Sequence, residues 1–448
     1  MLLRALICFF LFSEFFAFAK LSIISPHRKS IQNEFVPLFQ KYYKEKYGEE
    51  IEVDWIDQGG TENDLRFIIN RFSQNSKTSG IDLFWGGGEV TFYDLEKRGL
   101  LEPYKLPEKI DKSLPKVFSN LSFRSEKEVW YATALSSFGI FYNKRVLSLL
   151  KMPTPYTWKD LGKKEYYEYV SLSDPRQSSS SLMMFLIMLE SLGWEEGWAL
   201  LNKMAGNTRK FTHSSSDPIK AVLTGDAAMA AAINFYATPQ VASIGSKNLG
   251  FVLPEKATIF NSDPIGILRG APSRKEAERF VDFVLSPEAQ NLLIYPQGHE
   301  KGPKKSTLGR IAVIPEVYAE KSAILLDLLN PFKDQGVEMS LNIDRIVEEK
   351  NIIGELVGAV HVDLHSEIQA AWKTLIDHPD LEKEKLFVKP LVTKKEMEIY
   401  RNNWGNPVFR TKTTQEWIMR AKKRYEEVSK VNPIPCKGKD CLASSTFF

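Results

Sequence analysis

Residues Ile81-Asp-Leu-Phe-Trp-Gly-Gly-Gly88, and the segment that follows them to Gly99, decide the fold. Residues 81–85 are predicted to form a buried strand, the three glycines a turn, and the residues after them a helix that closes at Gly99. The same order of strand, turn and helix is predicted twice before this stretch. The repetition favours a parallel or mixed sheet covered by helices, with ligands bound beyond the carboxyl ends of the strands.

The two earlier units have the same local signals. Leu21 to Ser25 is predicted to be a buried strand, and the helix after it runs from Ser30 to about Tyr47. A second strand over residues 51–55 is indicated by alternating apolar residues, and Gln58-Gly-Gly-Thr61 then leads into a second helix. Both turns therefore precede a predicted helix start.

A second α/β unit is predicted to follow. Strands are expected at 138–142, 170–173 and 227–233, and the serines at 178–181 open a long helix. Asn261-Ser-Asp-Pro264 is interpreted as a turn before a returning strand at 265–268. The predicted organisation is a signal peptide at 1–19, lobe 1 at 20–133 and 256–310, lobe 2 at 134–255, a mostly helical C-terminal region at 311–430 and a tail at 431–448.

The N-terminus indicates export. Arg4 precedes an apolar run from Ala5 to Phe18, which ends at Ala17-Phe-Ala19, a small-x-small cleavage pattern. The alternatives are a membrane anchor, for which the run is short, and a lipid-modified Cys8, which lacks a small residue before it. We predict a periplasmic protein cleaved after Ala19.

The composition indicates which partners to expect, and the cysteines indicate the redox state of the compartment. Lys and Arg number 59 against 56 acidic residues, and no basic segment with interleaved aromatics stands out, so nucleic acid is not an expected partner. Cys436 and Cys441 lie five apart near the C-terminus. In an oxidising compartment this spacing favours a disulfide, and a metal pair is the alternative.

The turns supply the candidate site. Glycine turns at helix starts expose backbone N–H groups and the positive end of the helix dipole, which suits an anionic or polar ligand; alternatively, the glycines only permit tight turns. No cofactor and no resident metal are expected. The predicted ligand-binding residues are His27, Gly59, Gly60, Thr61, Gly86, Gly87, Gly88, Ser136, Ser137, Asp174, Ser178, Ser179, Asn234, Tyr236 and Asp263.

Three of these residues have open alternatives. His27 is either a loop histidine or a cleft donor to a carboxylate, phosphate or metal. Tyr236 is either a core or rim residue or a ring that contacts the ligand. Asp263 either caps the turn before Pro264 or binds a ligand cation.

The sequence resembles the solute-binding proteins of ABC importers, in the group that includes iron(III), thiamine, polyamine and phosphonate binders. The resemblance covers roughly residues 20 to 310. The matching stretches are Ile24-Ser-Pro-His27, Gly59-Gly-Thr61, Asp82-Leu-Phe-Trp-Gly-Gly-Gly88, Gly99-Leu-Leu-Glu-Pro103, Thr157-Trp-Lys-Asp-Leu161, Ser173-Asp-Pro175, Gly225-Asp226 and Ser286-Pro-Glu-Ala-Gln290.

The resemblance implies the type II two-lobed periplasmic-binding-protein fold, an α/β fold with a mixed sheet in each lobe. It also implies a ligand in the interlobe cleft, a permease of the inner membrane as partner, and a monomer. In the iron(III) binders the metal is held by an imidazole, a carboxylate and paired tyrosines. Here His27 matches the imidazole, Gly87 stands where the carboxylate would be, and Asn234-Phe-Tyr236 keeps one phenol. The full iron site is therefore not expected.

The functional alternative is a periplasmic hydrolytic enzyme. It would need a nucleophile with a base, a carboxylate pair or a metal cluster. The sequence has no Gly-x-Ser-x-Gly or His-Glu-x-x-His motif, and the nearest pair among its six histidines is His361 and His365. The binding function is therefore favoured, and no enzymatic activity is predicted.

Overall fold

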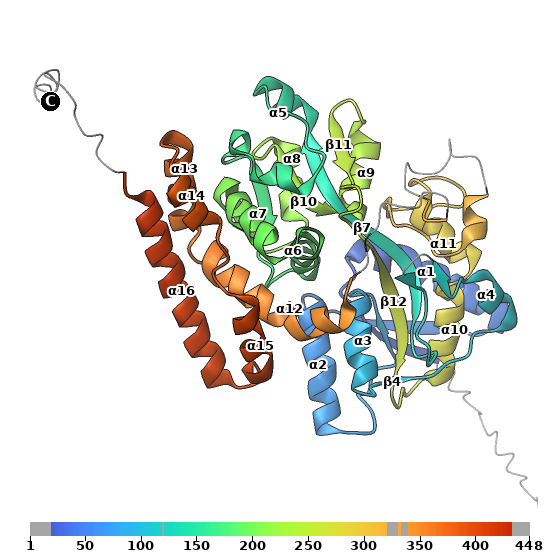
Figure 1. The fold of residues 1–448 in the computed structure, drawn as a ribbon. Helices are drawn as coiled ribbons and strands as arrows, with labels where there is room; N and C mark the ends of the chain where they lie inside the picture. The colour runs from blue at the N-terminus through green and yellow to red at the C-terminus, as the bar shows by residue number, and fades with distance from the viewer. Residues whose placement is uncertain (1–18, 119–120, 320–329, 333–338, 340, 432–448) are drawn as a thin grey trace, which may run out of the picture.

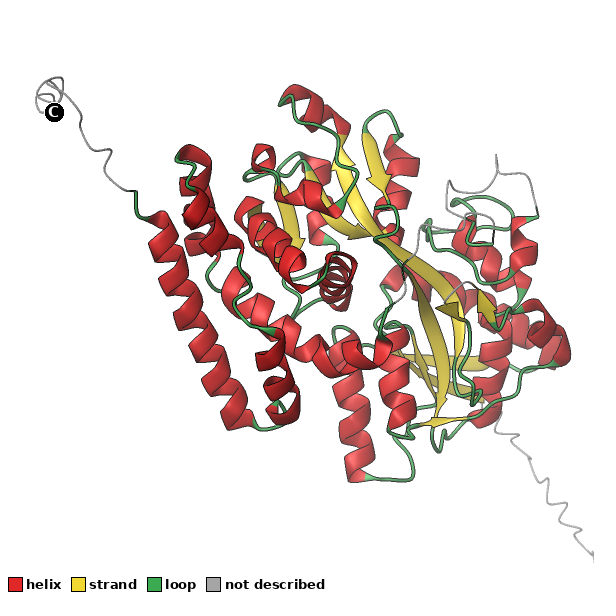
Figure 2. Ribbon diagram, in the orientation of Figure 1, coloured by secondary structure: helices red, strands yellow, loops and turns green. Residues whose placement is uncertain are grey.

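The computed structural model describes residues 19–118, 121–319, 330–332, 339 and 341–431. These residues form a ten-stranded mixed sheet flanked by helices (Figures 1 and 2). The strand order is β2 (Ile51–Ile56), β1 (Ala19–Ile24), β3 (Leu83–Trp85), β12 (Phe260–Leu268), β7 (Tyr131–Asn143), β10 (Met229–Ile233), β8 (Val170–Ser173) and β9 (Thr208–Thr212), with β4 (Leu101–Glu102) beside β12 and β11 (Leu249–Val252) beside β7. A separate small sheet pairs β5 (Val117–Phe118) with β6 (Leu121–Ser122).

Strands β1, β2 and β3 are parallel, as the repeated strand–turn–helix units predicted. Each runs into a helix, which confirms the α/β class. Gly86, Gly87 and Gly88 between β3 and its helix have φ angles of 94°, 90° and 83°, a region that side-chain-bearing residues rarely adopt. The helices in this part of the molecule are α1 (Lys29–Tyr47), α2 (Thr61–Gln74), α3 (Glu89–Lys97), α4 (Glu108–Ser113), α10 (Arg274–Val284) and α11 (Pro287–Ile294).

Strand β7 connects the two halves of the molecule. Its N-terminal part, up to Ser137, pairs with β12, and its C-terminal part, from Phe138, pairs with β10. We name the half built on β2, β1, β3 and β12 lobe 1, and the half built on β10, β8, β9 and β11 lobe 2. The lobes lie on either side of this strand in Figure 1. The exact lobe boundaries predicted from the sequence stay a prediction.

The sequence was interpreted as forming a turn at 261–264, and this interpretation is wrong. The segment lies inside β12, and the pairing with β7 shifts register between Asp263 and Pro264. A proline is tolerated at such an irregularity, because the register shift removes the need for a backbone N–H at that position. Asp263 is consequently a strand residue and does not cap a turn.

Lobe 2 and the C-terminal helices share one hydrophobic core. Trp372 of the C-terminal region packs on Gly206, where an added Cβ would lie 2.5 Å from the Trp372 Cβ atom. The Trp372 indole also donates to Asn207 at 2.7 Å. The helices of lobe 2 are α5 (Lys144–Leu149), α6 (Ser179–Leu192), α7 (Trp194–Asn207), α8 (Asp217–Thr224) and α9 (Asn234–Ile244). Those of the C-terminal region are α12 (Ile343–Val357), α13 (His365–Asp377), α14 (Leu381–Val388), α15 (Lys394–Asn403) and α16 (Pro407–Ser429).

Short helical turns occur at Trp158–Gly162, Lys164–Tyr166, Pro315–Tyr318 and Gly358–Val362. No helix in the described part of the chain has the length and apolar character that a membrane crossing requires. Residues 1–18 of the predicted signal peptide, with Cys8 among them, lie outside the described residues, and so does the predicted disulfide between Cys436 and Cys441.

Candidate ligand-binding cleft

A cavity of about 500 Å³ lies between the two lobes. The residue that precedes each of six helices lines it, three in lobe 1 and three in lobe 2. These residues are Arg28 before α1, Gly60 before α2, Gly88 before α3, Ser178 before α6, Ser216 before α8 and Ile233 before α9. The first N–H groups of a helix have no partner within the helix, and the helix dipole is positive at this end. The cavity wall is therefore suited to an anion.

Most of the predicted site residues meet at this cavity. Eleven of the fifteen line it: His27, Gly59, Gly60, Thr61, Gly87, Gly88, Ser136, Ser178, Ser179, Tyr236 and Asp263. The lobes also touch here, because the hydroxyls of Thr61 and Ser179 lie 3.3 Å apart. Contact of these residues with a ligand stays a prediction.

The other four predicted residues, Gly86, Ser137, Asp174 and Asn234, do not line the cavity. An added Cβ at Gly86 would lie 2.7 Å from the His27 ring, which covers this glycine. Asn234 is 2% exposed, and its side chain accepts from the Ser137 N–H at 2.9 Å. Asp174 holds Arg176 at 2.8 Å. These residues support the cavity wall or neighbouring segments and are not part of its lining.

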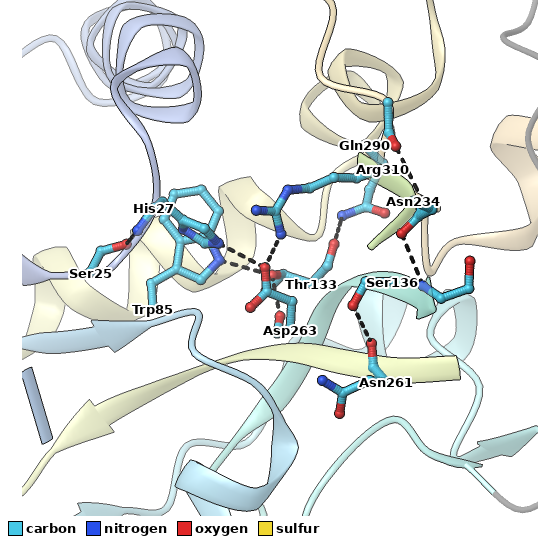
Figure 3. A network of polar contacts seen from close by, with 12 residues as sticks. Ser25, His27, Trp85, Thr133, Ser136, Asn234, Asn261, Asp263, Gln290 and Arg310 are labelled. Atoms are coloured by element: carbon cyan, nitrogen blue, oxygen red, sulfur yellow. Dashed lines mark hydrogen bonds and ion pairs between the residues drawn. The ribbon is translucent and has the colours of Figure 1, made fainter. Parts of the chain in front are cut away.

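His27, Asp263 and Arg310 line the cavity and belong to a network of polar contacts (Figure 3). Asp263 accepts from His27 Nε2 at 2.7 Å and forms an ion pair with Arg310, and all three side chains belong to residues that are 7% exposed. Burial alone would raise the pKa of Asp263, but the interactions with His27 and Arg310 outweigh it and hold that pKa below its ordinary range. The Asp263 carboxylate therefore stays ionised and is bound within the protein.

Behind this network, Trp85 is 3% exposed and packs edge-on against the His27 ring, with the centroids 4.8 Å apart. Its indole donates to Thr133 at 2.8 Å, and the Thr133 hydroxyl donates to the Asp263 backbone carbonyl at 2.7 Å. Trp85 therefore packs against His27 and supports the imidazole.

The ring of His27 is engaged by groups of the protein itself. Burial lowers the pKa of the imidazole, with Asp263 opposing and Arg310 adding to the shift. Nε2 is taken by Asp263, and the buried Nδ1 has no hydrogen-bond partner, so no serine or cysteine is placed against this ring. The described residues contain no group of three His, Cys, Asp or Glu side chains that could hold a metal.

Arg28 differs from the other basic side chains that line the cavity. Arg310 is paired with Asp263, and Lys350 lies 3.2 Å from Glu62. No carboxylate of the described residues lies within ion-pair distance of Arg28, whose guanidinium stacks 3.9 Å above the ring of Tyr236. A cation from lobe 1 therefore lies on an aromatic ring of lobe 2, with its charge available to a ligand.

Several lining residues were not selected from the sequence. Ser214, Ser215 and Ser216 precede α8, and a serine run before Asp217-Pro218 was a signal of the same kind as the serines before α6. Arg28 directly follows the predicted His27. Arg310 and Lys350 come from segments far along the chain, and no local motif marks Arg310.

The sequence is similar to those of known bacterial proteins. Residues 79–298 match the model of a family described as bacterial extracellular solute-binding proteins. A phosphoglycerate transport regulatory protein, PgtC, of Salmonella typhimurium is 26% identical over 181 residues, which are 40% of this chain and 45% of that protein. The chain thus spans about half the length of this curated relative.

Solved structures show the same fold. Apo ferric ion-binding protein A of Pasteurella haemolytica superposes with a TM-score of 0.59 at 16% identity, covering 77% of this chain and 98% of that one. The periplasmic binding protein AfuA of Actinobacillus pleuropneumoniae, with fructose-6-phosphate bound, gives 0.56 at 19% identity, covering 77% and 99%. The fold is the type II periplasmic-binding-protein fold, and the resemblance to solute-binding proteins of ABC importers is confirmed.

Proposed function

We propose that the chain is the substrate-binding component of an ABC importer, which captures a small anionic solute in the periplasm and delivers it to a membrane permease. The observation that carries the proposal is the set of six helix N-termini around one interlobe cavity, together with the guanidinium of Arg28. These groups bind negative charge without a resident metal. When the lobes close over the ligand, it would accept hydrogen bonds from backbone N–H groups of both lobes.

The comparisons support an anionic solute. The name of the Salmonella relative refers to phosphoglycerate, and the AfuA structure contains fructose-6-phosphate; both molecules carry a phosphate group. Iron-binding neighbours share the fold, but the resemblance implies Gly87 where an iron carboxylate ligand would stand, and His27 Nε2 is already bound by Asp263. A permease partner, a monomeric state and a periplasmic location belong to this proposal.

Replacing Arg28 tests the proposed site. Arg28→Met should weaken the binding of phosphoglycerate, measured by isothermal titration calorimetry, by about 10- to 100-fold, the effect of losing a hydrogen bond to a charged group. Thermal unfolding should change little, because Arg28 gives up only its stacking on Tyr236.

The matched control is Arg98→Met at the far end of α3. Arg98 pairs with Asp94 at 2.9 Å and does not line the cavity, so this variant should bind as the unchanged protein does. Equal affinities of the Arg28 and Arg98 variants would contradict the proposed role of Arg28. Failure of the unchanged protein to bind phosphoglycerate, fructose-6-phosphate or inorganic phosphate would contradict the anionic ligand.

The location has its own test. Export with cleavage after Ala19 should give a periplasmic protein whose intact mass corresponds to a chain beginning at Lys20. Strand β1 begins at Ala19, so cleavage there would leave the buried residues Leu21, Ile23 and Ile24 in place. A chain that keeps Met1 and sediments with membranes would contradict this prediction.

A further inference from the structure

Helix α12 of the C-terminal region carries a charged residue in its buried stripe. Ile346, Lys350 and Ile353 follow one another at helical spacing on the same face, and both isoleucines are buried. The Lys350 side chain is 8% exposed. A lysine is rarely buried unless its ammonium group has acceptors, so this position points to a specific role.

The C-terminal region is attached to lobe 2. Arg176 joins Asp174 of lobe 2 to Asp363, with a distance of 2.7 Å to the Asp363 carboxylate. Asn202 of α7 donates to the Phe387 carbonyl at 2.9 Å. Together with the shared hydrophobic core, these contacts tie α12–α16 to lobe 2, and we expect the two to move together.

Toward lobe 1, α12 passes next to α2 and α3 (Figure 1). The ion pair between Lys350 Nζ and Glu62 Oε1, at 3.2 Å, connects it to the first turn of α2. It is the ion pair that joins α12–α16 to lobe 1 in the described part of the chain. Lys350, Glu62 and Ile346 also line the interlobe cavity, so this contact is made at the cavity wall.

We propose that Lys350 is a ligand-binding residue, and that it receives a second acidic group of a solute whose first acidic group lies against Arg28. The inference rests on the proposed function. An ammonium group can donate three hydrogen bonds, and Glu62 is the one acceptor assigned to Lys350 among the described residues. Glu62 is 34% exposed and can turn toward water when a ligand anion takes its place.

The proposal makes the C-terminal region part of the binding site. The family match ends at residue 298, and the solved structures account for about three quarters of this chain while nearly their whole length is matched. Lys350 lies beyond the end of the family match. A solute with two acidic groups would contact Arg28 of lobe 1 and Lys350, which is tied to lobe 2, and would thereby favour the closed arrangement of the lobes.

Two substitutions separate ligand binding from a purely structural ion pair. Lys350→Met keeps an unbranched side chain in the apolar stripe and should weaken phosphoglycerate binding at least about tenfold, as expected for a charged hydrogen bond. Glu62→Gln removes the competing carboxylate, so its affinity for phosphoglycerate should be unchanged or higher. Inorganic phosphate, which has no second acidic group, should lose less than about threefold in the Lys350 variant.

The matched control is Lys373→Met, which removes an exposed lysine paired with Asp377 on α13 and should bind as the unchanged protein does. Thermal unfolding of each variant checks that it is folded. Wild-type affinity in Lys350→Met, or equal weakening by Lys350→Met and Glu62→Gln, would overturn the proposal. If Arg28→Met weakens binding while Lys350→Met does not, the proposed function stands and only this inference fails.

Discussion

Asp263→Asn should lower the free energy of unfolding by about 3–5 kcal/mol, the cost of leaving a buried charge without its partner. Asp263 lies between His27 Nε2, at 2.7 Å, and the guanidinium of Arg310. The neutral amide would leave the guanidinium of Arg310, which is 7% exposed at the cavity wall, without a carboxylate. Urea unfolding at neutral pH measures the loss.

Two variants control this experiment. Glu108→Gln breaks the exposed pair with Lys112 and should change the free energy of unfolding by less than about 0.5 kcal/mol. The double variant Asp263→Asn with Arg310→Met removes both charges, so its loss should be smaller than the sum of the two single losses. A single Asp263 variant as stable as the Glu108 variant would show that the network contributes little to folding.

Local patterns were sufficient for much of the fold. The alternation of Ile51, Val53 and Trp55 and the glycines at 86–88 act within a few residues, so β2, β3 and the turn into α3 could be predicted. Their parallel arrangement followed from the repeated order of strand and helix. The turn predicted at 261–264 was wrong because the register shift that accommodates Pro264 depends on pairing with β7, which is distant in the sequence.

Some residues of the candidate site could also be predicted from local patterns, and others could not. Thr61, Gly88 and Ser178 lie at helix starts that the sequence marks, and they line the cavity. Arg310 reaches Asp263 only because the chain returns to lobe 1, and no local pattern encodes that contact. Lys350 had a signal, since it interrupts the apolar stripe of α12, but its meaning depends on the packing of α12 across the lobes.

His361 lies in the interface between lobe 2 and the C-terminal region and is fully buried. The Asn202 amide group donates to the Phe387 carbonyl, so its oxygen, 2.8 Å from His361 Nε2, acts as the acceptor. His361 is therefore protonated on Nε2. Its buried Nδ1 has no partner among the described residues, and a proton added there would create an uncompensated charge. Burial, with a smaller effect of His365, lowers the pKa of His361 from 6.5 to about 3.

The low pKa of His361 should make the protein lose stability as the pH falls. Between pH 6.5 and pH 3 the unfolded chain binds a proton at this residue and the folded chain does not, so the free energy of unfolding decreases with decreasing pH. From pH 7 to pH 4 the contribution is about 3 kcal/mol. His361→Gln, which can still donate to Asn202, should show a urea-unfolding free energy that falls less over this range, by about that amount. His378→Gln, at an exposed histidine, should follow the unchanged protein. Parallel pH profiles for the His361 variant and the unchanged protein would mean that this histidine titrates alike in both states.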